Sequence, residues 1–105
     1  YADAFGEQWK QYRRTQLDSY TGTRYSTDRL RRCFGEALWR RLHEDRPLQV
    51  LEAGCGAGRF TEVLLATPAA VVTSTDLSAA VEPNQANFPQ SARHRVVQCD
   101  INRFP

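Results

Sequence analysis

Hydrophobic and polar positions recur along this chain with two spacings, one typical of helices and one typical of strands. Residues 1–20 predict an amphipathic helix with a narrow apolar face, because four side chains recur at helical spacing: Phe5, Trp9, Tyr12 and Gln16. Residues 28–42 predict a second helix with one broad buried face, interrupted at Gly35. The hydroxyl residues that end at Thr27 are suited to the N-cap of this second helix.

The second half of the chain predicts a regular succession of strands and helices. Three apolar runs predict strands, one around Val50 and Leu51, one over residues 69–75 and one over residues 94–99. Residues 58–66 and 79–87 predict the helices between them, and we expect Pro83 to start the regular part of the second helix. Helical crossovers of this kind join parallel neighbouring strands. We therefore expect an α/β fold whose parallel strands have the spatial order 3-2-1.

A glycine-rich turn separates the first strand from the helix that follows it. Gly54, Gly56 and Gly58 alternate there, and glycine lets the backbone adopt positive φ and lets a ligand lie against the main chain. A dinucleotide-binding turn has the pattern Gly-x-Gly-x-x-Gly. This chain has Arg59 at the third glycine position, and Glu52 lies just ahead of the turn. An acid there favours a ligand with a positive charge, such as an ammonium or a sulfonium, over a pyrophosphate.

An acidic residue at the end of the second predicted strand adds to this pattern. Asp76 follows Gly58 by 18 residues, close to the offset at which an acid accepts hydrogen bonds from ribose hydroxyls in nucleotide-binding units. Capping of the next helix is the alternative role for Asp76, although Ser78 is also suited to it. We favour the ribose role.

Composition and charge exclude several classes of function. The formal net charge of +2 is too small to indicate a nucleic-acid partner, and no apolar run is long enough for a membrane span or resembles a signal peptide. Three cysteines without a Cys-x-x-Cys pair indicate neither a disulfide framework nor a zinc site, so no metal is expected. Cys55 has no paired base in the sequence and is interpreted as a small residue in a tight turn, while His43 is interpreted as a polar helix cap. We expect a cytoplasmic protein.

Three stretches in this order resemble the class I S-adenosylmethionine-dependent methyltransferases: residues 50–58, 71–78 and 96–101. The resemblance implies a Rossmann-like methyltransferase fold that binds S-adenosyl-L-methionine as cofactor. It implies that Leu77 packs on the adenine, that Asp100 binds its exocyclic amine and that the backbone of Ile101 binds a ring nitrogen. Glu52 would face the methionine end of the cofactor. The implied cofactor-binding set is Glu52, Gly54, Cys55, Gly56, Gly58, Asp76, Leu77, Asp100 and Ile101.

The resemblance also divides the chain into two parts. Residues 1–46 would form a helical cap over the cofactor, and residues 47–105 the first half of the cofactor-binding domain. One N-terminal side chain would bind the cofactor carboxylate, with four candidates left open: Tyr12, Arg13, Arg24 and Arg29. Because only three strands are predicted, we expect an incomplete sheet, a fragment of a longer enzyme, and possible self-association through the exposed edge of strand 1.

Several questions of function stay open at the level of sequence. No catalytic residue is indicated, and neither the methyl acceptor nor the oligomeric state is encoded in a recognisable motif. A cofactor-binding module without catalysis, such as a pseudoenzyme or scaffold fragment, is one alternative to an enzyme. Another Rossmann-type enzyme with a nucleotide cofactor, acting by aminopropyl transfer or NAD-dependent oxidoreduction, is a second alternative, disfavoured by Arg59 and Glu52.

Overall fold

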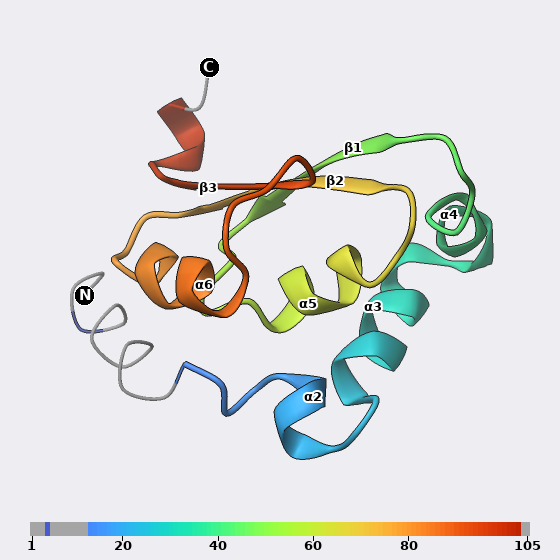
Figure 1. Cartoon of the computed structure of the whole chain (residues 1–105), viewed down its shortest axis with the longest axis horizontal. Coiled ribbons are helices and arrows are strands. Elements are labelled where there is room, and N and C mark those ends of the chain that lie inside the picture. The colour runs from blue at the N-terminus through green and yellow to red at the C-terminus, as the bar shows by residue number, and fades with distance from the viewer. Residues whose placement is uncertain (1–3, 5–12, 104–105) are drawn as a thin grey trace.

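The computed structural model of this chain describes residue 4 and residues 13–103 (Figure 1). Its elements follow in the order α2 (Asp18–Thr21), α3 (Tyr25–Phe34), α4 (Glu36–Arg41), β1 (Leu48–Ala53), α5 (Arg59–Leu65), β2 (Ala70–Asp76), α6 (Val81–Asn87), β3 (His94–Gln98) and the 3₁₀ helix η1 (Ile101–Arg103). Over the described part of the chain, no helix has both the length and the apolar character that crossing a membrane requires.

The three strands form one open, parallel sheet in the order β1-β2-β3, which confirms the predicted topology. Val50 of β1 pairs with Val72 of β2, and Thr73 of β2 pairs with Arg95 of β3. A parallel sheet built from consecutive strand–helix–strand units is consistent with a Rossmann-like arrangement. Among the described residues, β1 is paired on the β2 side alone. Self-association through its other edge stays a prediction.

The hydrophobic core lies between one face of the sheet and the helices. Helices α5 and α6 lie on the same side of the three strands in Figure 1, and the residues of β1 alternate between half-buried and exposed along the strand. The centre of the core is a buried cluster from α5, β2 and the end of α4: Leu42, Leu64, Ala70 and Val72. Leu30 and Phe34 of α3 pack against this cluster. The N-terminal part and the sheet therefore share one core.

The predicted helix over residues 28–42 is wrong in two respects. It consists of two helices, α3 and α4, because Gly35 adopts φ 81° and ψ 165° and turns the chain between them. Its beginning is also misplaced, since α3 starts at Tyr25 and its N-cap residue Arg24 makes no side-chain capping hydrogen bond. The Asp18 carboxylate takes the capping role instead and accepts hydrogen bonds from the backbone N–H groups of Ser26 and Thr27, both at 2.9 Å.

The predicted helix over residues 1–20 does not extend through its C-terminal part. Residues 13–16 form a turn, and Leu17 has the extended geometry φ −76°, ψ 136° before the short helix α2 begins. This break places the Asp18 carboxylate beside the first turn of α3, where it acts as a cap. The apolar positions 5, 9 and 12 of the predicted helix lie outside the described residues.

Helix α6 lies within the predicted range 79–87, but its regular part begins before Pro83 rather than at it. It starts at Val81, two residues before Pro83, and a turn closed by the hydrogen bond from the Glu82 N–H to the Ala79 carbonyl precedes it. Pro83 is the third residue of the helix, and the first four N–H groups of any helix lack an intrahelical acceptor. The missing N–H of Pro83 therefore costs no helical hydrogen bond, and there was no need to start the helix at the proline.

Candidate functional site

A cleft of about 320 Å³ lies at the carboxyl ends of β1 and β2. The loop from β1 to α5 supplies most of its wall, Asp76 enters from the end of β2, and Gln16 enters from the segment ahead of α2. The full set of lining residues is Gln16, Gly54, Cys55, Gly56, Ala57, Arg59, Phe60 and Asp76. Four of the sequence-predicted site residues thus lie around one cavity: Gly54, Cys55, Gly56 and Asp76.

The first and third glycines of the loop serve different purposes. Gly54 has φ 74°, and a Cβ added there would meet no heavy atom within 4 Å, so its bare backbone borders open space in the cleft. Gly58 has φ 111° and is buried, and an added Cβ would lie 2.5 Å from Cε2 of the Phe88 ring. Gly54 therefore leaves room for a ligand, whereas Gly58 allows α6 and the residue after it to approach α5 closely.

The Asp76 carboxylate holds the glycine loop against the end of β2. Its Oδ2 accepts a hydrogen bond from the Gly56 N–H at 2.9 Å, and its Oδ1 accepts from the N–H and the hydroxyl of Ser78 at 2.9 and 2.8 Å. The Cys55 N–H adds a second tie by donating to the Thr75 carbonyl at 2.8 Å. Each carboxylate oxygen has two lone pairs, so Asp76 retains acceptor capacity toward the cleft. Asp76 thus begins the turn at residues 77–80 and also borders the cavity.

Glu52 lies on the helix-covered face of β1, behind the loop. Its Oε1 is hydrogen-bonded to the Thr61 hydroxyl at 2.5 Å and to the Ser74 hydroxyl at 2.7 Å. Burial raises the pKa of Glu52, and these two hydrogen bonds only partly counteract it. Ser74 also contacts Nε2 of the buried His94 at 3.0 Å, and burial lowers the pKa of His94. Glu52 therefore belongs to a polar chain that crosses all three strands, and it is not among the residues that line the cleft.

Cys55 has the properties of a structural residue in this loop. Its side chain is buried, and burial together with the nearby Glu52 and Asp76 carboxylates raises the pKa of the thiol far above its ordinary value. A thiol is nucleophilic as the thiolate, so Cys55 is inert at neutral pH. This agrees with its interpretation from the sequence as a small residue in a tight turn.

The three residues assigned to adenine lie beside the cleft rather than in its wall. Leu77 is 61% exposed and Ile101 is 43% exposed, and neither they nor Asp100 line the cavity. The segment after β3 is nevertheless attached to the end of β2, because the Cys99 N–H donates to the Asp76 carbonyl at 3.0 Å. The Asp100 carboxylate accepts a hydrogen bond from the Asn102 N–H at 2.9 Å and so caps η1. Their contacts with adenine stay predictions.

None of the described candidates for the cofactor carboxylate lies at the cleft. Arg13, Arg24 and Arg29 are exposed and absent from its wall, and Tyr12 lies outside the described residues. The cation that does line the cleft is Arg59. The sequence signal for Arg59 is its position directly after the third glycine, at the start of α5.

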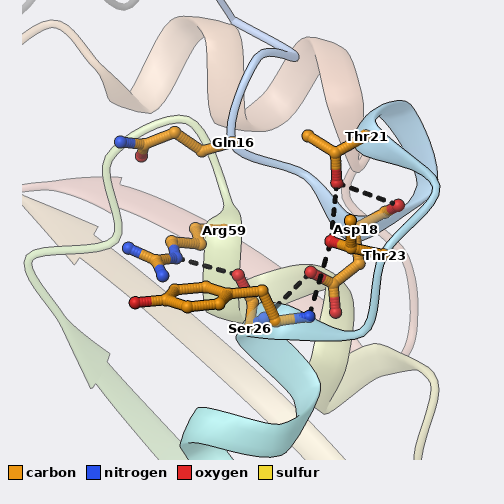
Figure 2. Close-up of a pocket in the computed structure, with 7 residues that line it drawn as sticks. Gln16, Asp18, Thr21, Thr23, Ser26 and Arg59 are labelled. Carbon is orange, nitrogen blue, oxygen red and sulfur yellow. Dashed lines mark hydrogen bonds between the residues drawn. The ribbon is translucent and has the colours of Figure 1, made fainter.

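Arg59 also lines a neighbouring hollow of about 380 Å³, shown in Figure 2. The wall of this hollow comes from the segment around α2, the start of α3 and the start of α5: Gln16, Asp18, Thr21, Thr23, Tyr25, Ser26 and Arg59. In Figure 2, Gln16 and Arg59 lie on one side and Asp18, Thr21 and Thr23 on the other. Since Gln16 and Arg59 line both cavities, they separate the hollow from the cleft.

The chain matches no model of a known protein family, and no curated protein matches it. Within residues 13–103, no group of three or more histidine, cysteine, aspartate or glutamate side chains is placed to hold a metal ion. The case for a function therefore rests on the geometry of the cleft.

Proposed function

We propose that this chain binds S-adenosylmethionine in the cleft at the ends of β1 and β2 and is the cofactor-binding part of a methyltransferase. The observation that carries the proposal is the convergence of the glycine loop and Asp76 on one cavity, joined by the hydrogen bond from the Gly56 N–H to the Asp76 carboxylate. In open α/β sheets, ligands bind outside the carboxyl ends of the strands, where this cavity lies.

The adenosine half of the ligand is supported by Asp76. Its carboxylate is fixed by three hydrogen bonds from the loop and the following turn, which leaves one lone pair, on Oδ2, in a defined orientation. The remaining lone pair lies on Oδ2, and it can accept a hydrogen bond from one ribose hydroxyl. The cavity of about 320 Å³ lies at the small end of the range for ligand pockets and suits part of a nucleoside-sized molecule.

The preference for a sulfonium ligand over a dinucleotide is supported by the acids near the loop. Glu52 lies behind the loop, and its raised pKa means that burial disfavours its negative charge. A positive charge on a ligand would favour the ionised form of Glu52, whereas a pyrophosphate in the cleft would be repelled by the Asp76 carboxylate in its wall. When bound, the cofactor supplies an activated methyl group. The tasks of this chain are to orient the cofactor and to keep water away from it.

The lining residues provide no general base. Asp76 already accepts three hydrogen bonds and its remaining lone pair is assigned to the ribose, and the Cys55 thiol is neutral and buried. Cofactor binding is therefore the step that this cleft itself supports. A module that binds the cofactor without transferring its methyl group stays the second candidate, and a methyl-transfer assay on the chain that contains this domain separates the two.

The binding step is tested by isothermal titration of the chain with S-adenosylhomocysteine and, separately, with NAD. We expect binding of S-adenosylhomocysteine, and we expect Asp76→Ala to weaken it by roughly 10-fold or more, because a charge-assisted hydrogen bond contributes about 1.5–3 kcal/mol. Ser78→Ala is the matched control, since it removes one of the same internal hydrogen bonds but leaves the carboxylate in place.

Two results would contradict the proposed function. Tight binding of NAD without binding of S-adenosylhomocysteine would show that the cleft accepts a dinucleotide instead. An unchanged affinity for S-adenosylhomocysteine in Asp76→Ala, with thermal melting to confirm that the variant folds, would remove the ribose role of this carboxylate.

A further inference from the structure

Arg59 is a half-buried cation that has no acidic partner among the described residues. Its Nε–H donates a hydrogen bond to the Ser26 hydroxyl at 2.8 Å, as Figure 2 shows. Its guanidinium carbon lies 5.1 Å from the centre of the Tyr25 ring and 5.0 Å from that of the Phe60 ring. Within residues 13–103, no carboxylate oxygen lies within 4.0 Å of its guanidinium nitrogens.

These contacts fix the guanidinium in place without neutralising its charge. Aromatic faces attract a cation through their ring quadrupoles, and a hydroxyl accepts one hydrogen bond without removing the positive charge. The contacts come from two separate elements, because Tyr25 and Ser26 begin α3 whereas Phe60 follows Arg59 in α5. The N–H groups on the two terminal nitrogens of Arg59 make no hydrogen bond with the described part of the chain. A positioned, unneutralised fork of donors is what recognition of a carboxylate requires.

The location of Arg59 identifies the ligand group that it faces. It lines the same cleft as Gly54 and Asp76, on the α5 side of the glycine loop. If Asp76 holds the ribose, the amino-acid end of the ligand extends from the ribose along the loop, and the cation that lines the described wall of the cleft is Arg59. The exposed Arg13, Arg24 and Arg29 do not reach this wall.

We propose that Arg59 binds the α-carboxylate of the cofactor's amino-acid end, and that the Tyr25 and Phe60 rings and the Ser26 hydroxyl position its guanidinium for this contact. This assignment rests on the proposed function. It adds a carboxylate-binding residue that the sequence analysis did not assign and replaces the candidates from the N-terminal segment. It also explains why an arginine is useful at the position where a dinucleotide-binding loop requires glycine.

The test compares two probes that differ only in the carboxylate: S-adenosylhomocysteine and its decarboxylated form, 5′-deoxy-5′-(3-aminopropylthio)adenosine. The wild-type chain should bind S-adenosylhomocysteine at least 10-fold more tightly, because a charge-assisted pair contributes roughly 10-fold to 150-fold in affinity. Arg59→Gln should reduce this ratio to about one, chiefly by weakening the binding of S-adenosylhomocysteine. Arg59→Lys retains the charge but not the fork, so it should retain only part of the ratio.

Arg29→Gln is the matched control, since Arg29 is an exposed arginine of α3 away from the cleft. It should keep the wild-type ratio. Thermal melting of each variant shows whether the loss of the contacts with Tyr25 and Phe60 has unfolded the chain, and Arg59→Lys provides a second measurement if Arg59→Gln is unstable.

The possible outcomes distinguish this inference from the proposed function. If both probes bind but the wild type does not discriminate between them, or if Arg59→Gln weakens both equally, Arg59 does not contact the carboxylate. If Arg29→Gln removes the discrimination instead, the residue is one of the N-terminal candidates. If neither probe binds the wild type, the proposed function fails and the role of Arg59 fails with it.

Discussion

Replacing Gly58 by alanine should destabilise this chain much more than replacing Gly54, although both belong to the same loop. Both glycines have positive φ, 74° at Gly54 and 111° at Gly58, so alanine is strained at either position. The difference lies in the surroundings. An added Cβ meets nothing within 4 Å at Gly54, whereas at Gly58 it would lie 2.5 and 2.8 Å from two ring atoms of Phe88.

The expected free energies of unfolding follow from these contacts. An L-residue in a left-handed conformation costs roughly 1–2 kcal/mol, and the lower entropy of the unfolded alanine chain offsets about 0.4–1 kcal/mol of this. Gly54→Ala should therefore destabilise the chain by about 0–1.6 kcal/mol. Overpacking adds roughly 1–3 kcal/mol when a methyl group is forced into an occupied site. Gly58→Ala should consequently destabilise it by about 1–4.6 kcal/mol.

Urea unfolding followed by circular dichroism measures both variants, and a double-mutant cycle with Phe88→Ala isolates the contact. In the Phe88→Ala background the ring is absent and the nearest atom to an added Cβ is the Asn84 Nδ2 at 3.3 Å, so Gly58→Ala should cost clearly less than it does in the wild-type background. The reasoning is refuted if Gly58→Ala costs the same with and without the Phe88 ring, or if it is no more destabilising than Gly54→Ala in the wild-type background.

Two further predictions concern pH and helix capping. Asp18→Ala should destabilise the chain by about 1–2 kcal/mol in urea unfolding at pH 7, because the carboxylate caps the first turn of α3. Burial raises the pKa of Asp18, but the hydrogen bonds from Ser26 and Thr27 outweigh burial and lower the pKa overall. The stability advantage of the wild type over Asp18→Ala should therefore disappear as the pH falls below about 4, where the carboxylate becomes protonated. A stability advantage that persists at lower pH would contradict the capping role. Burial lowers the pKa of His94, so the folded chain favours the neutral imidazole, and the stability from this group is lost as the pH falls from about 6.5 toward its folded pKa. His94→Gln should therefore lose less stability than the wild type between pH 7.5 and 5.5, and equal losses would contradict this assignment.

The sheet and the position of the cleft could be predicted from the sequence because they depend on local order along the chain. Alternating strands and helices dictate a parallel sheet, and the carboxyl ends of its strands meet at one edge. Asp76 and the glycine loop therefore had to be neighbours once β1 and β2 were correctly identified. The chemistry of the cleft wall followed in the same way for Gly54 and Gly56.

The errors arose where distant or backbone interactions decide the structure. Helical periodicity is equally compatible with one helix containing Gly35 and with two helices that meet there, because side-chain spacing does not report the φ of glycine. The cap of α3 comes from Asp18, outside the few residues on which capping rules depend. The environment of Arg59 depends on Tyr25 and Ser26, which reach it only after α3 packs against α5. No local pattern encodes that contact.

The hydroxyl of Ser74 has a single hydrogen for two neighbours, and this couples the charges of Glu52 and His94. The Phe88 carbonyl can only accept, so Nδ1 of His94 carries a hydrogen. In one arrangement the Ser74 hydroxyl donates to Nε2 of His94, and a protonated Glu52 donates to the Ser74 oxygen, so that Glu52 and His94 are both uncharged. In the other arrangement the Ser74 hydroxyl donates to the Glu52 carboxylate, and Nε2 of His94 carries a hydrogen that it donates to the Ser74 oxygen. Glu52 and His94 are then both ionised, because Nδ1 of His94 also carries a hydrogen. Because burial raises the pKa of Glu52 and lowers that of His94, the folded chain favours the uncharged arrangement, so a change of charge on one of these groups alters the hydrogen bonding of the other through Ser74.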